Sequence, residues 1–119
     1  NTTPSMGVTL ARACAHNFVY YYQNNANRIT GGAISNNTWT HIALTRSSGS
    51  TKLFINGTQS GSTYTDTNNY VLSPCYIGQF SDGVGGGYFN GYISDLRITK
   101  GVARYTANFT PPTAALPTY

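Results

Sequence analysis

Carboxyl groups that could take part in acid–base chemistry are scarce in this sequence of 119 residues. It contains Asp66, Asp82 and Asp95 and no glutamate. A glycoside hydrolase needs two carboxyl groups about 5 to 9.5 Å apart, one of which stays protonated to act as the acid. Because long stretches of sequence separate the three aspartates, the pattern does not predict such a pair. We therefore expect that the chain is not an enzyme and does not hydrolyse a polysaccharide on its own.

The two histidines and two cysteines are the remaining candidates for nucleophilic chemistry. His41 lies in the strand-like run WTHIA and is interpreted as a structural, hydrogen-bonding residue. Cys14 lies two residues before His16, so both would share one face of a strand without facing a substrate. Cys14 and Cys75 could form one disulfide or remain two buried free thiols, and the sequence leaves both alternatives open. The paired spacings of a zinc site are absent.

A surface rich in Asn, Gln and Tyr is better suited to binding than to catalysis, because amide groups and aromatic faces hold sugars. The candidate site is the glycine-rich loop over residues 79–90, where Asp82, Tyr88 and Asn90 could converge at the rim of a sheet. Glycines would allow a ligand to approach the backbone closely. The alternative is a solvated loop that is rich in glycine for conformational reasons.

The net charge of +4 does not form a basic patch. The seven Lys and Arg residues are scattered, whereas nucleic-acid binders cluster such residues on one face. Charged residues make up 8% of the chain, far below the roughly 25% of an average soluble domain. We expect no nucleic-acid partner, and the short apolar runs predict no insertion into a membrane.

Short β-branched and aromatic runs separated by Gly, Asn and Ser clusters predict an all-β sandwich or barrel within one domain, residues 1–119. Strands are predicted over residues 6–15, 17–23 and 28–30, with a break at Gly31-Gly32. Residues 39–46 and 52–56 form a predicted hairpin, and Asn56-Gly57 supplies the next tight turn. Further strands are predicted over residues 70–72, 75–79 and 91–99. In the last one, Tyr92, Leu96 and Ile98 share one face.

Four motifs in order, WTHIALTR, KLFING, YIG and NGYISDLRITKGVARYTANFTPP, resemble the laminin-G-like domains of the concanavalin A-like lectin/glucanase superfamily. The amino-acid sequence of the last motif is similar to the closing segment of such domains in bacteriophage structural proteins, for example tail fibres. The resemblance is good over residues 39–112. It implies an antiparallel jelly-roll β-sandwich of which this chain is expected to be the C-terminal part, with residues 100–119 wrapping across the sandwich.

The resemblance also implies a function and a set of structural residues. It implies a non-enzymatic carbohydrate-binding or adhesion module on a virion surface or outside the cell, with a cell-surface glycan as partner. The alternative is a capsid-decoration or fibre-spacer domain that assembles with copies of itself. Some relatives bind calcium at such a rim, so Asp82 is a candidate calcium ligand. The expected structural residues are Trp39, Ile42, Leu44, Leu53, Ile55, Ile77, Leu96, Ile98, Tyr105 and Phe109.

Overall fold

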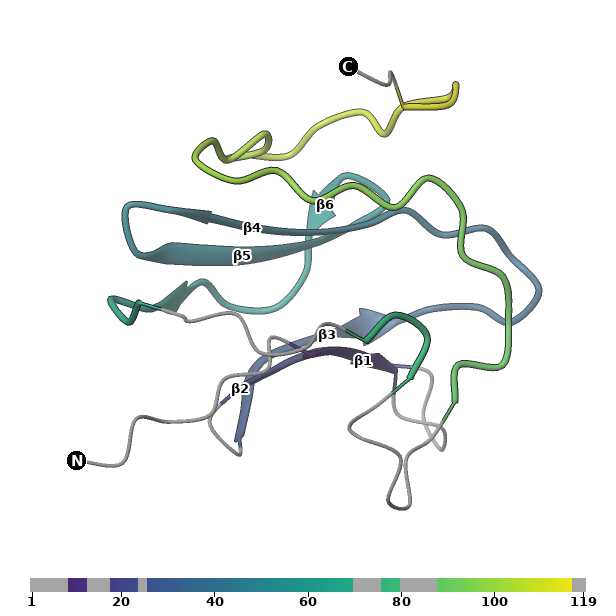
Figure 1. Cartoon of the computed structure of the whole chain (residues 1–119), viewed down its shortest axis with the longest axis horizontal. Helices are drawn as coiled ribbons and strands as arrows, with labels where there is room; N and C mark the ends of the chain where they lie inside the picture. The colour runs from purple at the N-terminus through teal and green to yellow at the C-terminus, as the bar shows by residue number, and fades with distance from the viewer. Residues whose placement is uncertain (1–8, 13–17, 24–25, 70–75, 80–87, 117–119) are drawn as a thin grey trace.

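The computed structural model describes residues 9–12, 18–23, 26–69, 76–79 and 88–116, and the regular elements in these ranges are all strands (Figure 1). All strand pairs are antiparallel. This confirms the predicted all-β, antiparallel class. The strands are β1 (Thr9–Arg12), β2 (Phe18–Gln23), β3 (Ala26–Ala33), β4 (Ile42–Ser47), β5 (Ser50–Ile55), β6 (Thr58–Gln59) and β7 (Tyr64–Thr65).

The first sheet has the strand order β1-β2-β3. Its central strand, β2, alternates strictly between buried and half-buried side chains, as period-two geometry requires. Tyr21 is buried in the core, and Tyr20 and Tyr22 lie on the opposite face. The register between β2 and β3 shifts twice, on either side of the pairs Tyr20–Thr30 and Tyr21–Ile29. The run of three tyrosines is thus divided between core and surface and does not form one aromatic platform.

The second sheet is built on the hairpin of β4 and β5, which runs in register from Ile42–Ile55 to Ser47–Ser50. Ser48 and Gly49 form its turn with φ values of 46° and 79°. β6 and β7 both pair with β5. The turn into β6 uses Asn56 and Gly57, with φ values of 50° and 80°. Asn and Gly tolerate this left-handed conformation, so the turns lie where the sequence predicts them.

The core lies between the two sheets. Val19, Tyr21 and Ile29 from the first sheet pack with Leu53 of β5, which is fully buried. Partly buried side chains, among them Ile42, Leu44 and Ile55, pack against this cluster. The predicted break at Gly31-Gly32 is wrong, because β3 continues through both glycines. Gly31 is needed for packing instead: a Cβ there would lie 2.7 Å from Leu53 Cδ2.

The C-terminal part of the chain forms a third layer over the outer face of β4 and β5 (Figure 1). Phe109 covers Phe54, which is fully buried, with their ring centroids 5.5 Å apart. The backbone N–H of Phe109 donates to the carbonyl of Gly57, and the side chain of Asn108 accepts from the N–H of Gln59. Residues 105–109 therefore lie across the hairpin.

Several predicted core residues are exposed. Residues 91–99 form no strand in the structure, and Leu96 and Ile98 are 57% and 78% exposed. A strand needs a neighbour for its backbone groups, and none of the described strands pairs with these residues. Trp39 is 72% exposed because β4 begins only at Ile42, and Ile77 is also exposed. These four residues do not belong to the core of this structure.

Candidate functional site

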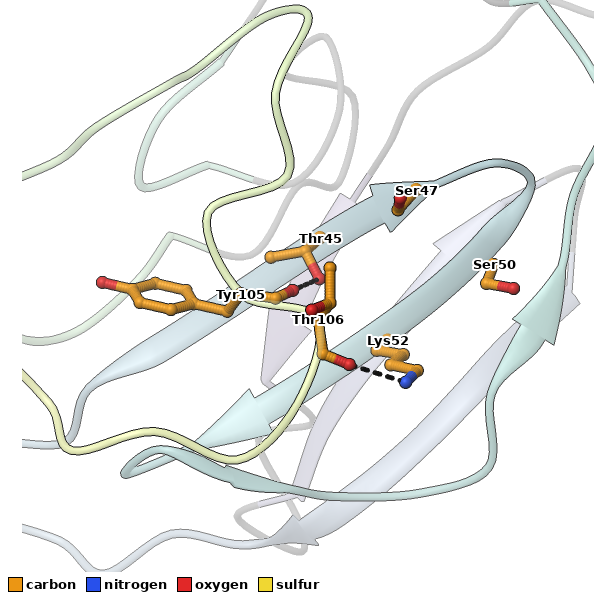
Figure 2. Close-up of a pocket in the computed structure, with 6 residues that line it drawn as sticks. All are labelled: Thr45, Ser47, Ser50, Lys52, Tyr105 and Thr106. Atoms are coloured by element: carbon orange, nitrogen blue, oxygen red, sulfur yellow. Dashed lines mark hydrogen bonds between the residues drawn. The ribbon is translucent and has the colours of Figure 1, made fainter.

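A pocket of about 220 Å³ opens on the outer face of the β4–β5 hairpin, beside the C-terminal segment that covers the hairpin (Figure 2). Its floor consists of two cross-strand pairs, Thr45–Lys52 and Ser47–Ser50. Because side chains alternate along a strand, these four point away from the face that carries Leu44 and Leu53. Tyr105 and Thr106 complete the lining from the C-terminal segment. The pocket thus joins residues that are about sixty positions apart in the chain.

Two hydrogen bonds attach the C-terminal segment to the pocket floor (Figure 2). The Thr45 hydroxyl donates to the carbonyl of Tyr105 at 2.7 Å, and the Lys52 ammonium donates to the carbonyl of Thr106 at 2.8 Å. An ammonium group has three N–H donors, so this bond leaves Lys52 further donors for a ligand. The exposed side chains of Ser47 and Ser50 form the end of the pocket at the hairpin turn.

An aromatic group adjoins the pocket at its other end. The Tyr105 ring extends away from the two serines (Figure 2). It stacks on Phe109 at 3.5 Å, with an angle of 7° between the ring planes. His41 packs edge-on against Phe109 at 5.5 Å and against Tyr105 at 6.3 Å. His41 Nδ1 is buried without a hydrogen-bond partner in the described part of the chain. This ring therefore packs among aromatic groups, in contrast to its predicted hydrogen-bonding role.

The described lining of the pocket contains one charged group and several hydroxyl groups. Lys52 is the charged residue there, and the described part of the lining includes no carboxylate, imidazole or thiol. Asp66 is 1% exposed, and its Oδ1 accepts from the backbone and side chain of Asn68. No group of three or more His, Cys, Asp or Glu residues that could hold a metal ion occurs within the described ranges. The pocket is suited to hydrogen bonding with a polar or anionic ligand.

The predicted loop site is described only at its ends. Asp82, which is also the predicted calcium ligand, lies outside the described residues. Tyr88 forms an isolated bridge with Gln79, and the N–H of Phe89 donates to the carbonyl of Gly78, so the two ends of the loop meet. Tyr88 and Asn90 are exposed there. Cys14 and Cys75 also lie outside the described residues, so the disulfide and the loop site stay predictions.

Of the residues that line the pocket, only Tyr105 was singled out from the sequence, as a structural residue, although part of the signal for the others was present. The hairpin register follows from its two-residue turn, which pairs Ser47 with Ser50 and Thr45 with Lys52. A hydroxyl-rich outer face could have been derived from that register. The position at which Thr106 crosses this face depends on tertiary packing and has no local signal.

The family of the chain follows from its match to known proteins. The family model described as the concanavalin A-like lectin/glucanases superfamily, of the laminin G type, matches residues 3–104. The chain belongs to this superfamily, so the resemblance seen in the motifs is confirmed at that level. No curated protein and no solved structure is significantly similar to the chain. Among the described residues, no helix is long and apolar enough to cross a bilayer.

Proposed function

We propose that this chain is a non-enzymatic carbohydrate-binding or adhesion module of a structural protein on a virion surface or outside the cell. The observation that carries the proposal is the pocket on the outer face of β4 and β5. Among the described residues, its lining offers hydroxyl groups and one ammonium group and contains no carboxylate. Membership of a superfamily of lectins and glucanases supports the same class of ligand. Because function is not determined by fold alone, the proposal depends on this site.

In this proposal a saccharide unit occupies the pocket between the hairpin turn and the C-terminal segment. The hydroxyls of Ser47 and Ser50 exchange hydrogen bonds with sugar hydroxyls, and Lys52 donates from its remaining N–H groups. A neighbouring sugar unit of the same glycan would lie near Tyr105, whose half-buried ring adjoins the pocket. A surface with few charges suits a polysaccharide, which is recognised by hydrogen bonding more than by net charge.

The proposed partner is a cell-surface polysaccharide, as the similarity of the closing motif to phage fibre proteins implies. A calcium ion bound through Asp82 is a separate proposal, since that residue does not belong to the pocket. Titration with calcium, followed by calorimetry and by thermal unfolding, tests it. The ion is expected to raise the melting temperature if it binds, and an unchanged melting temperature with no heat of binding contradicts the proposal.

A glycan array screened with the purified chain tests the sugar proposal, followed by calorimetry with any oligosaccharide that binds. The double substitution Ser47→Ala and Ser50→Ala should weaken that binding by roughly fivefold to a hundredfold, because each hydrogen bond contributes about 0.5–1.5 kcal/mol. Ser62→Ala is the matched control, since Ser62 is exposed and lies outside the pocket lining. Unchanged binding by the double variant would exclude this pocket as the site.

A further inference from the structure

A run of large apolar side chains is exposed along residues 88–102, which do not line the pocket described above. Tyr92 is 88% exposed, Ile98 78%, Leu96 57% and Ile93 51%. Monomeric soluble proteins rarely expose large contiguous apolar patches, and such patches commonly mark contacts with another protein. The composition of this segment therefore indicates a protein partner more than a sugar.

The backbone of the same segment is also available for pairing. Residues 92–96 form no backbone–backbone hydrogen bond with any other described residue. The segment alternates like a strand, but Asp95, with a φ of 51°, interrupts its extended course. Asp visits this left-handed conformation more readily than most residues, and the extended conformation is open to it as well. An unpaired, apolar, strand-like segment is a template for pairing with another chain.

We infer that residues 92–100 pair antiparallel with the same residues of a second copy of this chain, in a two-fold arrangement centred on Leu96. In this register Asp95 of each copy lies opposite Arg97 of the other. A two-fold interface is self-complementary, so the favourable charge pair occurs twice. Opposite charges directly across an antiparallel pair are stabilising, and like charges there are destabilising.

The charges distinguish this register from the nearest symmetric alternatives. A register centred on Asp95 would place that carboxylate opposite its own copy, and one centred on Arg97 would do the same with the guanidinium. Arg97 makes a further contact within its own chain. Its five N–H donors can serve a second acceptor in addition.

Centring on Leu96 also brings exposed apolar groups together. Leu96 lies opposite its own copy, and Ile98 lies opposite Ser94 on the same face. On the other face Ile93 lies opposite Thr99, beside the two charge pairs. The pairing would satisfy backbone groups of residues 92–96 and cover Leu96 and Ile98, both exposed in the single chain. Asp95 would adopt an extended backbone in the dimer.

Analytical ultracentrifugation of the complete chain tests the inference through charge reversal. Asp95→Arg places two positive groups opposite each other at both symmetric positions, and Arg97→Asp places two negative groups there. Each variant alone should dimerise at least about tenfold more weakly than the unaltered chain. An equimolar mixture of the two variants should dimerise again, because the two positive groups of one variant would then oppose the two negative groups of the other.

Two further variants keep the test decisive. The double variant Asp95→Arg with Arg97→Asp restores opposite charges within one chain and should recover the dimer. Asn27→Arg, which adds a positive charge at an exposed position of β3, should leave the dimer unchanged. Circular dichroism establishes that each variant is folded. A monomeric unaltered chain at roughly 100 μM, or association that survives both single reversals, would overturn the inference. Because no variant touches the pocket, failure here leaves the sugar proposal unaffected.

Discussion

Phe109 makes three aromatic contacts, one within the C-terminal segment and two with side chains of the hairpin and of the residue before it. It stacks on Tyr105, packs edge-on against Phe54 and meets the ring of His41. Aromatic pairs in offset or edge-to-face geometry contribute about 0.5–1.5 kcal/mol beyond the area they bury. A single side chain therefore couples the fully buried Phe54 to a segment that has no regular secondary structure of its own.

Replacing Phe109 by alanine should destabilise the chain by about 3 kcal/mol, the lower end of the range for a large aromatic side chain, because the ring is only partly buried. Denaturant unfolding measures this loss as a change in the free energy of unfolding. Phe89→Ala is the control, since Phe89 is 41% exposed and lies in the exposed apolar run, outside the segment that covers the hairpin. Equal effects of the two substitutions would show that Phe109 does not anchor the segment.

At the scale of elements, the structure depends on two turns whose glycines both adopt positive φ but have different surroundings. Gly49 closes the β4–β5 hairpin, and a Cβ there would lie 3.2 Å from the carbonyl oxygen of Asp66. Gly57 opens β6, and a Cβ there would collide with the carbonyl of Phe109, in the segment that covers the hairpin. Both glycines thus serve a turn beside a distant segment, but only at Gly57 would a Cβ collide with that segment.

Gly57→Ala should therefore destabilise the chain more than Gly49→Ala. Both substitutions carry the cost of an alanine at positive φ, about 1–3 kcal/mol, but only the first also displaces the C-terminal segment. Thermal unfolding of the two variants gives the comparison, and the substitution at Gly57 should also lower any binding of sugar in the adjoining pocket. Equal melting temperatures would mean that the segment adjusts without cost.

Elements defined by local signals were predictable from the sequence, whereas those that depend on a partner were not. Asn56-Gly57 and the alternation of residues 42–46 are local, and both match the structure. The strand predicted over residues 91–99 has the right alternation, but alternation cannot tell whether another strand is available beside it. The prediction that Gly31 breaks a strand is wrong. A small residue is required there by the close approach of Leu53, and this tertiary contact leaves no local signal in the sequence.

On the scale of the whole molecule, the pocket and the apolar run lie on different parts of the chain. The pocket is formed by β4, β5 and residues 105–106, and the apolar run precedes this crossing in the sequence. Sequence reasoning predicted the fold class and the superfamily, because both follow from motifs. It did not locate the pocket, which forms where residues 105 and 106 cross the hairpin.

Together, the two proposals predict that a dimer binds a dense glycan surface more tightly than a monomer does. Two linked sites that can engage one surface gain apparent affinity of about 10²–10⁴-fold without any new contact. The variant Asp95→Arg should thus bind a soluble oligosaccharide in calorimetry with unchanged affinity, since it leaves the pocket intact. On immobilised polysaccharide the same variant should dissociate faster than the unaltered chain, and the double charge reversal should recover slow dissociation. Equal dissociation rates for a monomeric variant and the dimer would mean that the two pockets cannot reach one surface together.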